Sequence, residues 1–411
     1  MWHFKTAFLG LLLVLPNSAL GFKGFDISNV SYDIESRLDE KDKSLRGSEI
    51  ISFKTGERTY SELYFYIYQH FHPSFFSLDS AFVNGKSAKV LIPDIGNKDL
   101  LRIPLDDTLA PHSSVEVKLY FLLGFGDDID EYKAAYWRGD FYFGDCYPKL
   151  AEFDWEGAVL PDTTKAIPPM KDKRASACGA ESYLEETYER MADYRLKMTL
   201  PVRFKIIAPG DCQDTLVNSD GTKTQTYEAK RFPRILWIAT TNRELLERDF
   251  GDFRVYCYYP PKDRKRAEET VNKINVIREY YSEEFGPFPR PQLKVFLMNL
   301  PFYLGGMSGD DMLFLSRGGG ILDQIVGSKM TLAHEVSHQW WGDAIACGAG
   351  TEGWFAEALA CYSAELFCSD HKDYCQDKSL LGGWNDKSGL GMYIYAARGD
   401  QDESLRGGGV G

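Results

Sequence analysis

The chain has 411 residues, of which 44% are hydrophobic and 14% aromatic, and its formal net charge is −13. A chain of this length and apolar content can form two or more globular domains, so a wholly disordered protein is excluded. The acidic balance argues against a nucleic-acid partner, because binding phosphates requires a basic surface. The one cationic cluster, residues 262–266, fits the exposed start of a helix better than a binding patch.

Residues 1–21 have the features of a secretory signal peptide. Lys5 supplies a positive charge, residues 7–15 are apolar, and residues 19–21 resemble a cleavage site. Pro16 interrupts the apolar segment, which is too short for a membrane span. We therefore expect a secreted, periplasmic or extracellular protein, with membrane association only if this segment stays uncleaved. The eight cysteines fit export, and their spacing favours disulfides or buried thiols over a zinc knuckle.

Residues 22–250 are predicted to form a β-rich domain with mostly antiparallel strands. Two segments alternate apolar and polar residues, as half-buried strands do; their apolar residues are Val30, Tyr32, Ile34, Val115, Val117, Leu119 and Phe121. Asn84-Gly85 between short apolar segments is typical of a hairpin turn. Residues 61–69 are apolar or aromatic on both faces, which predicts a strand covered on both sides. Residues 161–182 are predicted to form an exposed loop.

The pattern changes near residue 250, where we place the domain boundary. A helix is predicted over residues 263–285, with Val271, Ile274, Ile277 or Arg278, and Tyr281 in phase. Gly286-Pro287 ends this helix, and residues 293–298 are predicted to form a short buried strand. The glycine-rich residues 407–411 close no element. We therefore expect residues 251–411 to be an incomplete domain from a longer protein.

The most specific motif is His334-Glu335-Val336-Ser337-His338, followed by Glu357. Two histidines four residues apart project from one face of a helix, so both imidazoles can reach one metal ion. Glu357 would supply a third ligand and leave a fourth position open, as catalytic zinc requires. The motif predicts one Zn²⁺ per chain, with Glu335 taking a proton from activated water. The alternative is a buried helix with two hydrogen-bonded histidines and an unrelated Glu357, a combination that chance produces rarely.

The residues around the motif predict two helices. The first runs over residues 328–341 and ends at Gly342, with Met330, Ala333, Val336 or Ser337, and Trp340 on its buried side. The second runs over residues 354–367, and its predicted apolar side consists of Phe355, Ala358, Leu359, Tyr362 and Leu366. Cys361 lies four residues after Glu357, where a group that orients a ligand would be useful, but we expect it to pack.

The stretch 334–342 (HEVSHQWWG), together with residues 354–360 (WFAEALA), resembles the zinc aminopeptidases of the alanyl aminopeptidase (aminopeptidase N) type. These enzymes are gluzincins, which are related to the leukotriene hydrolases. Residues 305–309 (GGMSG) are similar to the family's exopeptidase loop, G-A-M-E-N or G-G-M-E. The resemblance extends over most of residues 30–365. It implies an α+β, multidomain fold in which a mostly antiparallel N-terminal β domain precedes a thermolysin-like catalytic domain that is truncated at its C-terminal end.

The resemblance implies an exported zinc-dependent aminopeptidase that hydrolyses N-terminal peptide bonds. Its metal ligands would be His334, His338 and Glu357, its general base Glu335, and its partners peptide substrates. The substrate would contact the loop residues Gly305, Gly306, Met307 and Ser308.

Two departures from the family keep alternatives open. Ser308 stands where the family has the acidic residue that binds the substrate's α-amino group, although Asp310 or Asp311 could replace it. The family's catalytic Tyr lies further downstream than Tyr393 and Tyr395, the last tyrosines of this chain. The alternatives are a zinc peptidase without strict aminopeptidase specificity, and an inactive or truncated zinc-binding homologue.

Overall fold

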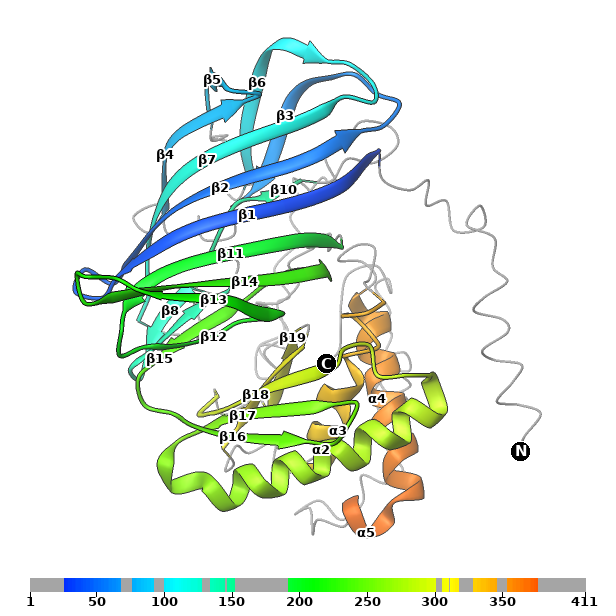
Figure 1. Ribbon diagram of the computed structural model, residues 1–411. Coiled ribbons are helices and arrows are strands. Elements are labelled where there is room, and N and C mark those ends of the chain that lie inside the picture. Colours follow the sequence, from blue (N-terminus) through cyan, green and yellow to red (C-terminus); the bar gives the residue numbers. More distant parts are fainter. Residues whose placement is uncertain are drawn as a thin grey trace, which may run out of the picture.

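The protein combines a large, strand-rich N-terminal part with a smaller C-terminal part in which helices pack on a sheet (Figure 1). The computed structural model describes residues 26–67, 76–91, 100–127, 134–144, 146–151, 191–300, 305–309, 311–317, 328–345 and 353–375. The predicted signal peptide and the predicted loop over residues 161–182 lie outside these residues. No helix of the described part is long and apolar enough to cross a membrane.

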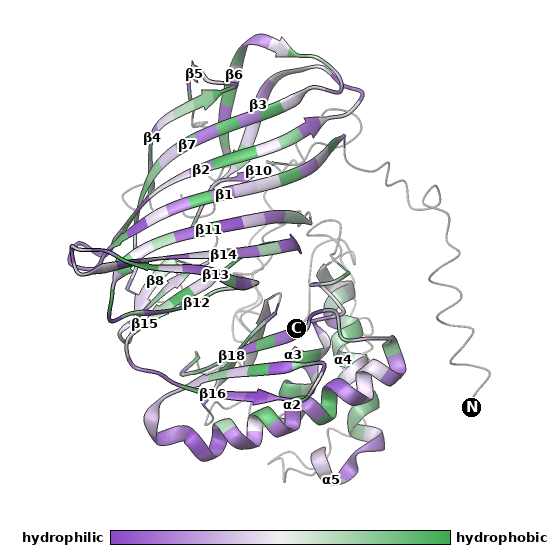
Figure 2. Cartoon of the chain, viewed as in Figure 1, coloured by the Kyte–Doolittle hydropathy of each residue, from purple (hydrophilic) through white to green (hydrophobic). Residues whose placement is uncertain are grey.

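The N-terminal part is dominated by an eight-stranded sheet in the order β13-β14-β11-β1-β2-β7-β4-β5. All neighbours in this sheet are antiparallel except β1 and β11. The strands are β1 (Ile27–Asp39), β2 (Ser44–Thr55), β4 (Phe76–Val83), β5 (Lys86–Ala88), β7 (Ser114–Gly124), β11 (Ala192–Pro201), β13 (Asp211–Val217) and β14 (Thr222–Phe232). The predicted alternation in β1 and β7 is confirmed, because all seven apolar residues are buried. Figure 2 shows this alternation as bands of hydropathy along the strands.

Two local predictions for this part can be compared with the structure. The hairpin turn is confirmed: Asn84 and Gly85 connect β4 to β5 with φ values of 49° and 77°, which a type I′ turn requires. The strand predicted over residues 61–69 is β3 (Tyr60–Tyr66), but Ser61 is exposed, so cover on both faces was wrong for its start. Consecutive residues are buried only from Phe65 onward, where β10 pairs with β3.

Two smaller sheets complete the N-terminal part, in the orders β10-β3-β6 and β12-β15-β9-β8. Their remaining strands are β6 (Leu100–Leu109), β8 (Ala134–Trp137), β9 (Asp140–Phe143), β10 (Lys149–Leu150), β12 (Lys205–Ile207) and β15 (Trp237–Thr240). The four-stranded sheet faces the C-terminal part. Its residues Tyr142 and Ile238 share a buried apolar cluster with Phe296 and Phe314 of the next sheet, so apolar burial joins the two parts.

The C-terminal part is built on a five-stranded sheet in the order β16-β17-β18-β20-β19. Its strands are β16 (Glu244–Asp249), β17 (Arg254–Tyr259), β18 (Gln292–Met298), β19 (Gly306–Gly309) and β20 (Met312–Ser316). The three central strands are parallel, and the edge strand β19 is antiparallel to β20. This sheet begins at Glu244, a few residues before the boundary predicted near residue 250, which stays a prediction.

Helices lie against this sheet (Figure 1). They are α2 (Arg264–Phe285), preceded by the 3₁₀ turn η3 (Pro261–Asp263), α3 (Ser328–Ser337), α4 (Gly353–Asp370) and α5 (Lys372–Cys375). The predicted helix over residues 263–285 is confirmed as α2, and its four in-phase apolar residues are at most 1% exposed. Gly286 ends α2 with a φ of 100°, where a side chain would be strained. The predicted strand over residues 293–298 is confirmed as β18, which is buried almost throughout.

The described part contains both a disulfide-bonded cysteine and buried thiols, the two states that the sequence predicts. Cys368 is disulfide-bonded, whereas Cys257 is a buried thiol and Cys361 a partly buried one. Burial raises the pKa of the Cys257 thiol, as expected for a packed side chain away from any cation.

Candidate metal centre

The helix that carries the two histidines is shorter than its sequence predicts. A helix was expected over residues 328–341, but α3 ends at Ser337 and a tighter turn follows. The amides of Gln339 and Trp340 bond to the carbonyls of Val336 and Ser337, which are three residues back rather than four. Gly342, with a φ of 106°, ends the turn as predicted. The buried side of the helix is confirmed, with Ala333, Val336 and Ser337 fully buried.

The second helix exists, but its predicted apolar side is wrong. α4 spans Gly353–Asp370, and Ala358 and Tyr362 are exposed. The buried side consists instead of Ala356, Ala360, Ser363, Ala364 and Phe367. The apolar residues of α4 itself occur on all sides of the helix, so their spacing does not predict which side is buried. Small residues face the interior because α4 packs closely beside α3.

Three side chains from α3, its terminal turn and α4 converge on one point. The two Nε2 atoms of His334 and His338 lie 3.0 Å apart. The carboxylate of Glu357 lies 3.2 Å from His334 Nε2 and 3.4 Å from His338 Nε2. These three ligand atoms are within 4.8 Å of one another. Tetrahedral zinc with bonds of 2.0–2.1 Å holds its ligand atoms about 3.3 Å apart, so the observed separations fit this ion.

The outer nitrogen of each histidine also has a neighbour. His338 Nδ1 lies 2.9 Å from the carbonyl oxygen of Trp341, and only a protonated Nδ1 can donate to a carbonyl. His334 Nδ1 lies 3.7 Å from the Sγ atom of Cys361. The expectation that Cys361 merely packs was therefore wrong, because α4 turns the thiol toward a histidine. The Trp341 contact directs an unprotonated Nε2 of His338 at the shared point, which suits a cation there.

Protonation in the site is strongly coupled. Burial raises the pKa of Glu335 to about 7, with the charge of Glu357 adding to the rise and His334 opposing it. Burial also acts to raise the pKa of Glu357, but the hydrogen bond from His334 and the two imidazoles outweigh it and hold the pKa at about 2. Burial lowers the pKa of His338. Glu357 is thus the fixed anion of the site, and Glu335 can exchange a proton near neutral pH.

The predicted substrate loop lies directly beside Glu335. Gly306, the first residue of the edge strand β19, leaves no room for a side chain: a Cβ atom there would lie 2.6 Å from Glu335 Cγ. The carboxylate of Glu335 is therefore held between α3 and β19. Because β19 is the edge strand, its outer side can pair with an extended peptide. Gly305 precedes the strand, and Met307 and Ser308 lie within it.

Gln339 connects β19 to the turn after α3 through hydrogen bonds. The sequence did not suggest this role. Its Nε2 atom lies 2.9 Å from Ser308 Oγ and 3.1 Å from the carbonyl oxygen of Gly309. The same atom lies 2.9 Å from Oδ2 of Asp343, and Ser308 Oγ donates to that oxygen across 3.1 Å. A buried carboxylate thus lies directly behind Ser308. In the sequence, the only feature that could have indicated this role was the position of Gln339 directly after His338.

Asp310 and Asp311 were proposed to replace the acidic residue that is absent at Ser308, and the structure tests only Asp311. Asp311 is buried and its Oδ2 lies 3.2 Å from Lys294 Nζ, so its charge is neutralised away from the metal centre. The same oxygen accepts a hydrogen bond from the amide of Gly210 in the N-terminal part. Asp311 as a stand-in is therefore wrong. Asp310, Tyr393 and Tyr395 lie outside the described residues.

Comparison with known proteins identifies the fold. No protein-family model and no curated protein matches the chain. A crystal structure of an M1 zinc metallopeptidase from Deinococcus radiodurans is similar, with a TM-score of 0.57 and 14% identity over 85% of this chain and 72% of that one. A crystal structure of a point mutant of that enzyme gives the same TM-score and identity over 93% and 77% of the two chains. The predicted α+β, multidomain fold is thereby confirmed, and it is the fold of the M1 zinc metallopeptidases.

Proposed function

We propose that this protein is a zinc-dependent peptidase that removes N-terminal residues from peptides. One observation carries the proposal. Three side chains converge at separations that fit a bound zinc ion: the Nε2 atoms of His334 and His338 and the carboxylate of Glu357. Glu335 lies beside them. The alternative of a buried helix with an unrelated Glu357 does not explain why the Glu357 carboxylate lies 3.2 Å and 3.4 Å from the Nε2 atoms of the two histidines. The similarity to M1 zinc metallopeptidases supports the same function.

In this proposal His334, His338 and Glu357 hold one zinc ion per chain. Bound zinc would polarise the scissile carbonyl and make a water molecule more acidic. Glu335 accepts the proton of that water and passes it to the leaving amine. Burial supports this role, because a carboxyl group whose pKa lies near 7 can both take and return a proton at neutral pH.

The edge strand β19 positions the peptide. An extended substrate that pairs with β19 would run beside Glu335, because Gly306 brings the strand into contact with that carboxylate. Glycine at positions 305 and 306 lets the two backbones approach closely. A substrate bound in this way would have its backbone next to the proposed base.

The restriction to N-terminal residues rests on a separate feature. Ser308 carries no charge, but Asp343 lies 3.1 Å behind it. We assign to Asp343 the negative charge that attracts the α-ammonium group of the substrate, with Ser308 between them. The second candidate function is a zinc peptidase that ignores the state of the N-terminus. It is favoured by the burial of Asp343, which is only 4% exposed.

A matched pair of peptides separates the two functions. The zinc-loaded protein is incubated with one peptide bearing a free N-terminus and with the same peptide N-acetylated. An aminopeptidase releases the first residue of the free peptide and leaves the blocked one intact, whereas equal cleavage of both would exclude the exopeptidase function. No cleavage of either would favour the inactive homologue. We also propose export, on the basis of residues 1–21, which a processed N-terminus in culture medium would test.

A further inference from the structure

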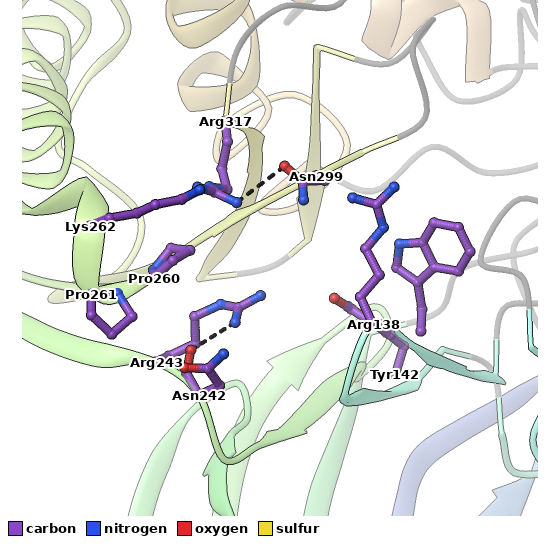
Figure 3. Close-up of a pocket in the computed structure, with 10 residues that line it drawn as sticks. Arg138, Tyr142, Asn242, Arg243, Pro260, Pro261, Lys262, Asn299 and Arg317 are labelled. Carbon is purple, nitrogen blue, oxygen red and sulfur yellow. Dashed lines mark hydrogen bonds between the residues drawn. The ribbon is translucent and has the colours of Figure 1, made fainter.

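A cavity lies where the two parts of the molecule meet, and it is lined by cations. It has a volume of about 370 Å³, which falls within the range of small-molecule sites. Arg138 and Arg243 come from the N-terminal part, and Lys262 and Arg317 from the C-terminal part. In Figure 3 these four side chains extend into the same space. None of the described residues that line the wall carries a carboxylate, although acidic residues outnumber basic ones in the chain as a whole.

Local structure explains how each cation reaches the cavity. Arg138 and Gly139 form the turn between β8 and β9, with φ values of 50° and 93°. The Arg138 guanidinium stacks over the ring of Trp137 at 4.9 Å, which holds it at the tip of the hairpin. Lys262 belongs to η3 at the start of α2, and Arg317 follows β20. The cavity therefore lies at the carboxyl ends of the parallel strands and at the amino end of a 22-residue helix, two places that favour anions.

Two of the four charges are neutralised and two are not. Arg243 pairs with Asp140 at 2.7 Å, and Arg317 pairs with Asp263. Arg138 and Lys262 form no ion pair with any residue of the described part. The cavity therefore carries an excess of two positive charges that no described side chain balances. A salt bridge that merely joins the two parts would need an acid on one side, and neither Arg138 nor Lys262 pairs with an acid among the residues that the structure describes.

Two hydrogen-bond donors of the wall also lack a partner among the described residues. The Nε1 atom of Trp137 and the Nε atom of Arg243 are buried and have no hydrogen-bond partner within the described residues. Both groups are donors that cannot accept, and a buried donor without a partner is costly. A ligand that complements this wall must therefore supply acceptor oxygens as well as negative charge.

We propose that this cavity binds a small oxyanion, a phosphate or carboxylate group, between Arg138 on one part and Lys262 on the other. The site is independent of the proposed peptidase function. Because its walls come from both parts of the molecule, a bound anion ties the four-stranded sheet to the five-stranded one. Bound anion should therefore raise the temperature of unfolding in a saturable way.

The test measures binding of inorganic phosphate and of citrate by calorimetry and by thermal unfolding. The double variant Arg138→Gln/Lys262→Gln removes the two unbalanced charges. The control Arg264→Gln/Lys265→Gln removes the same charge from the next residues of α2, which do not line the cavity. All four side chains are exposed, so both variants should fold.

We expect wild type and control to bind at least one of the two anions, and the cavity variant to bind it at least about tenfold more weakly. Phosphate binding alone identifies a phosphate ligand, and citrate binding alone a carboxylate ligand. Unchanged affinity in the cavity variant overturns the proposal, because the anion would then bind elsewhere, for example at the metal. Equal losses in both variants, or no saturable binding of either anion, would overturn it as well.

Discussion

Gly306→Ala is expected to reduce turnover sharply while leaving the metal site intact. The added Cβ atom would lie 2.6 Å from Glu335 Cγ and 2.9 Å from its Cδ and Oε1 atoms. Ordinary contacts begin at 3.4 Å, so the carboxylate or the strand must move by about 0.8 Å. Glu335 is only 7% exposed and cannot simply turn into solvent. Misplacing a reacting group by about 1 Å can cost about 10²-fold in rate.

The same strand provides the control. At Gly309 an added Cβ atom would meet only Leu236 Cδ2 at 3.1 Å, the end of a flexible side chain. Gly309→Ala should therefore keep kcat within about twofold of wild type, whereas Gly306→Ala should lower it about 10²-fold. Steady-state kinetics on a free-amine peptide, with bound zinc measured in each sample, makes the comparison. Full turnover in Gly306→Ala would refute the close contact between β19 and the proposed base.

Three other substitutions each test the role of a single side chain. Cys361→Ala removes the group beside His334 Nδ1 and should weaken zinc binding about tenfold in chelator competition, while Cys361→Ser keeps an atom there that can accept a hydrogen bond from Nδ1. Equal affinity in both would show that the thiol only packs. Asp343→Asn should raise KM for a free-amine peptide about tenfold with a smaller change in kcat, and an unchanged KM would mean that another group binds the amine. Glu49 in β2 is fully buried without a hydrogen bond in the described part, and burial holds its pKa well above 4.5. The folded protein therefore keeps this proton to higher pH than the unfolded chain, so stability falls as pH rises above 4.5. Glu49→Gln should raise Tm little below pH 4.5 and increasingly as the pH rises from 4.5 toward the raised pKa of Glu49 in the folded protein. A Tm difference that is independent of pH would contradict the pKa shift.

Periodicity predicted the elements with one clear buried face. Val117 in β7 and Ile274 in α2 occupy positions where apolar residues recur at the period of a strand or a helix, and both are fully buried. In α4 the rule failed, because apolar residues occur on every side. Contact with α3 then decides that Ala360 faces inward and Tyr362 outward. Such contacts depend on tertiary packing, which local sequence does not encode.

The convergence of the proposed metal ligands could be predicted because helix geometry fixes the two histidines relative to each other, and the motif spacing adds Glu357. The groups around them could not. Gln339, Cys361 and Asp343 act through contacts between α3, α4 and β19, and no spacing rule connects these elements. The cationic cavity could not be predicted from the sequence either, because more than 170 residues separate Arg138 from Arg317.

Turnover of a free-amine peptide by wild type and by Glu335→Gln, at equal zinc content, tests the central claim most directly. Gln keeps the size of the side chain and all three proposed ligands but cannot accept a proton. The account predicts one zinc per chain in both proteins and a rate at least about 10²-fold lower in the variant. Zinc-loaded wild type that hydrolyses nothing, or a variant that retains full activity, would contradict it.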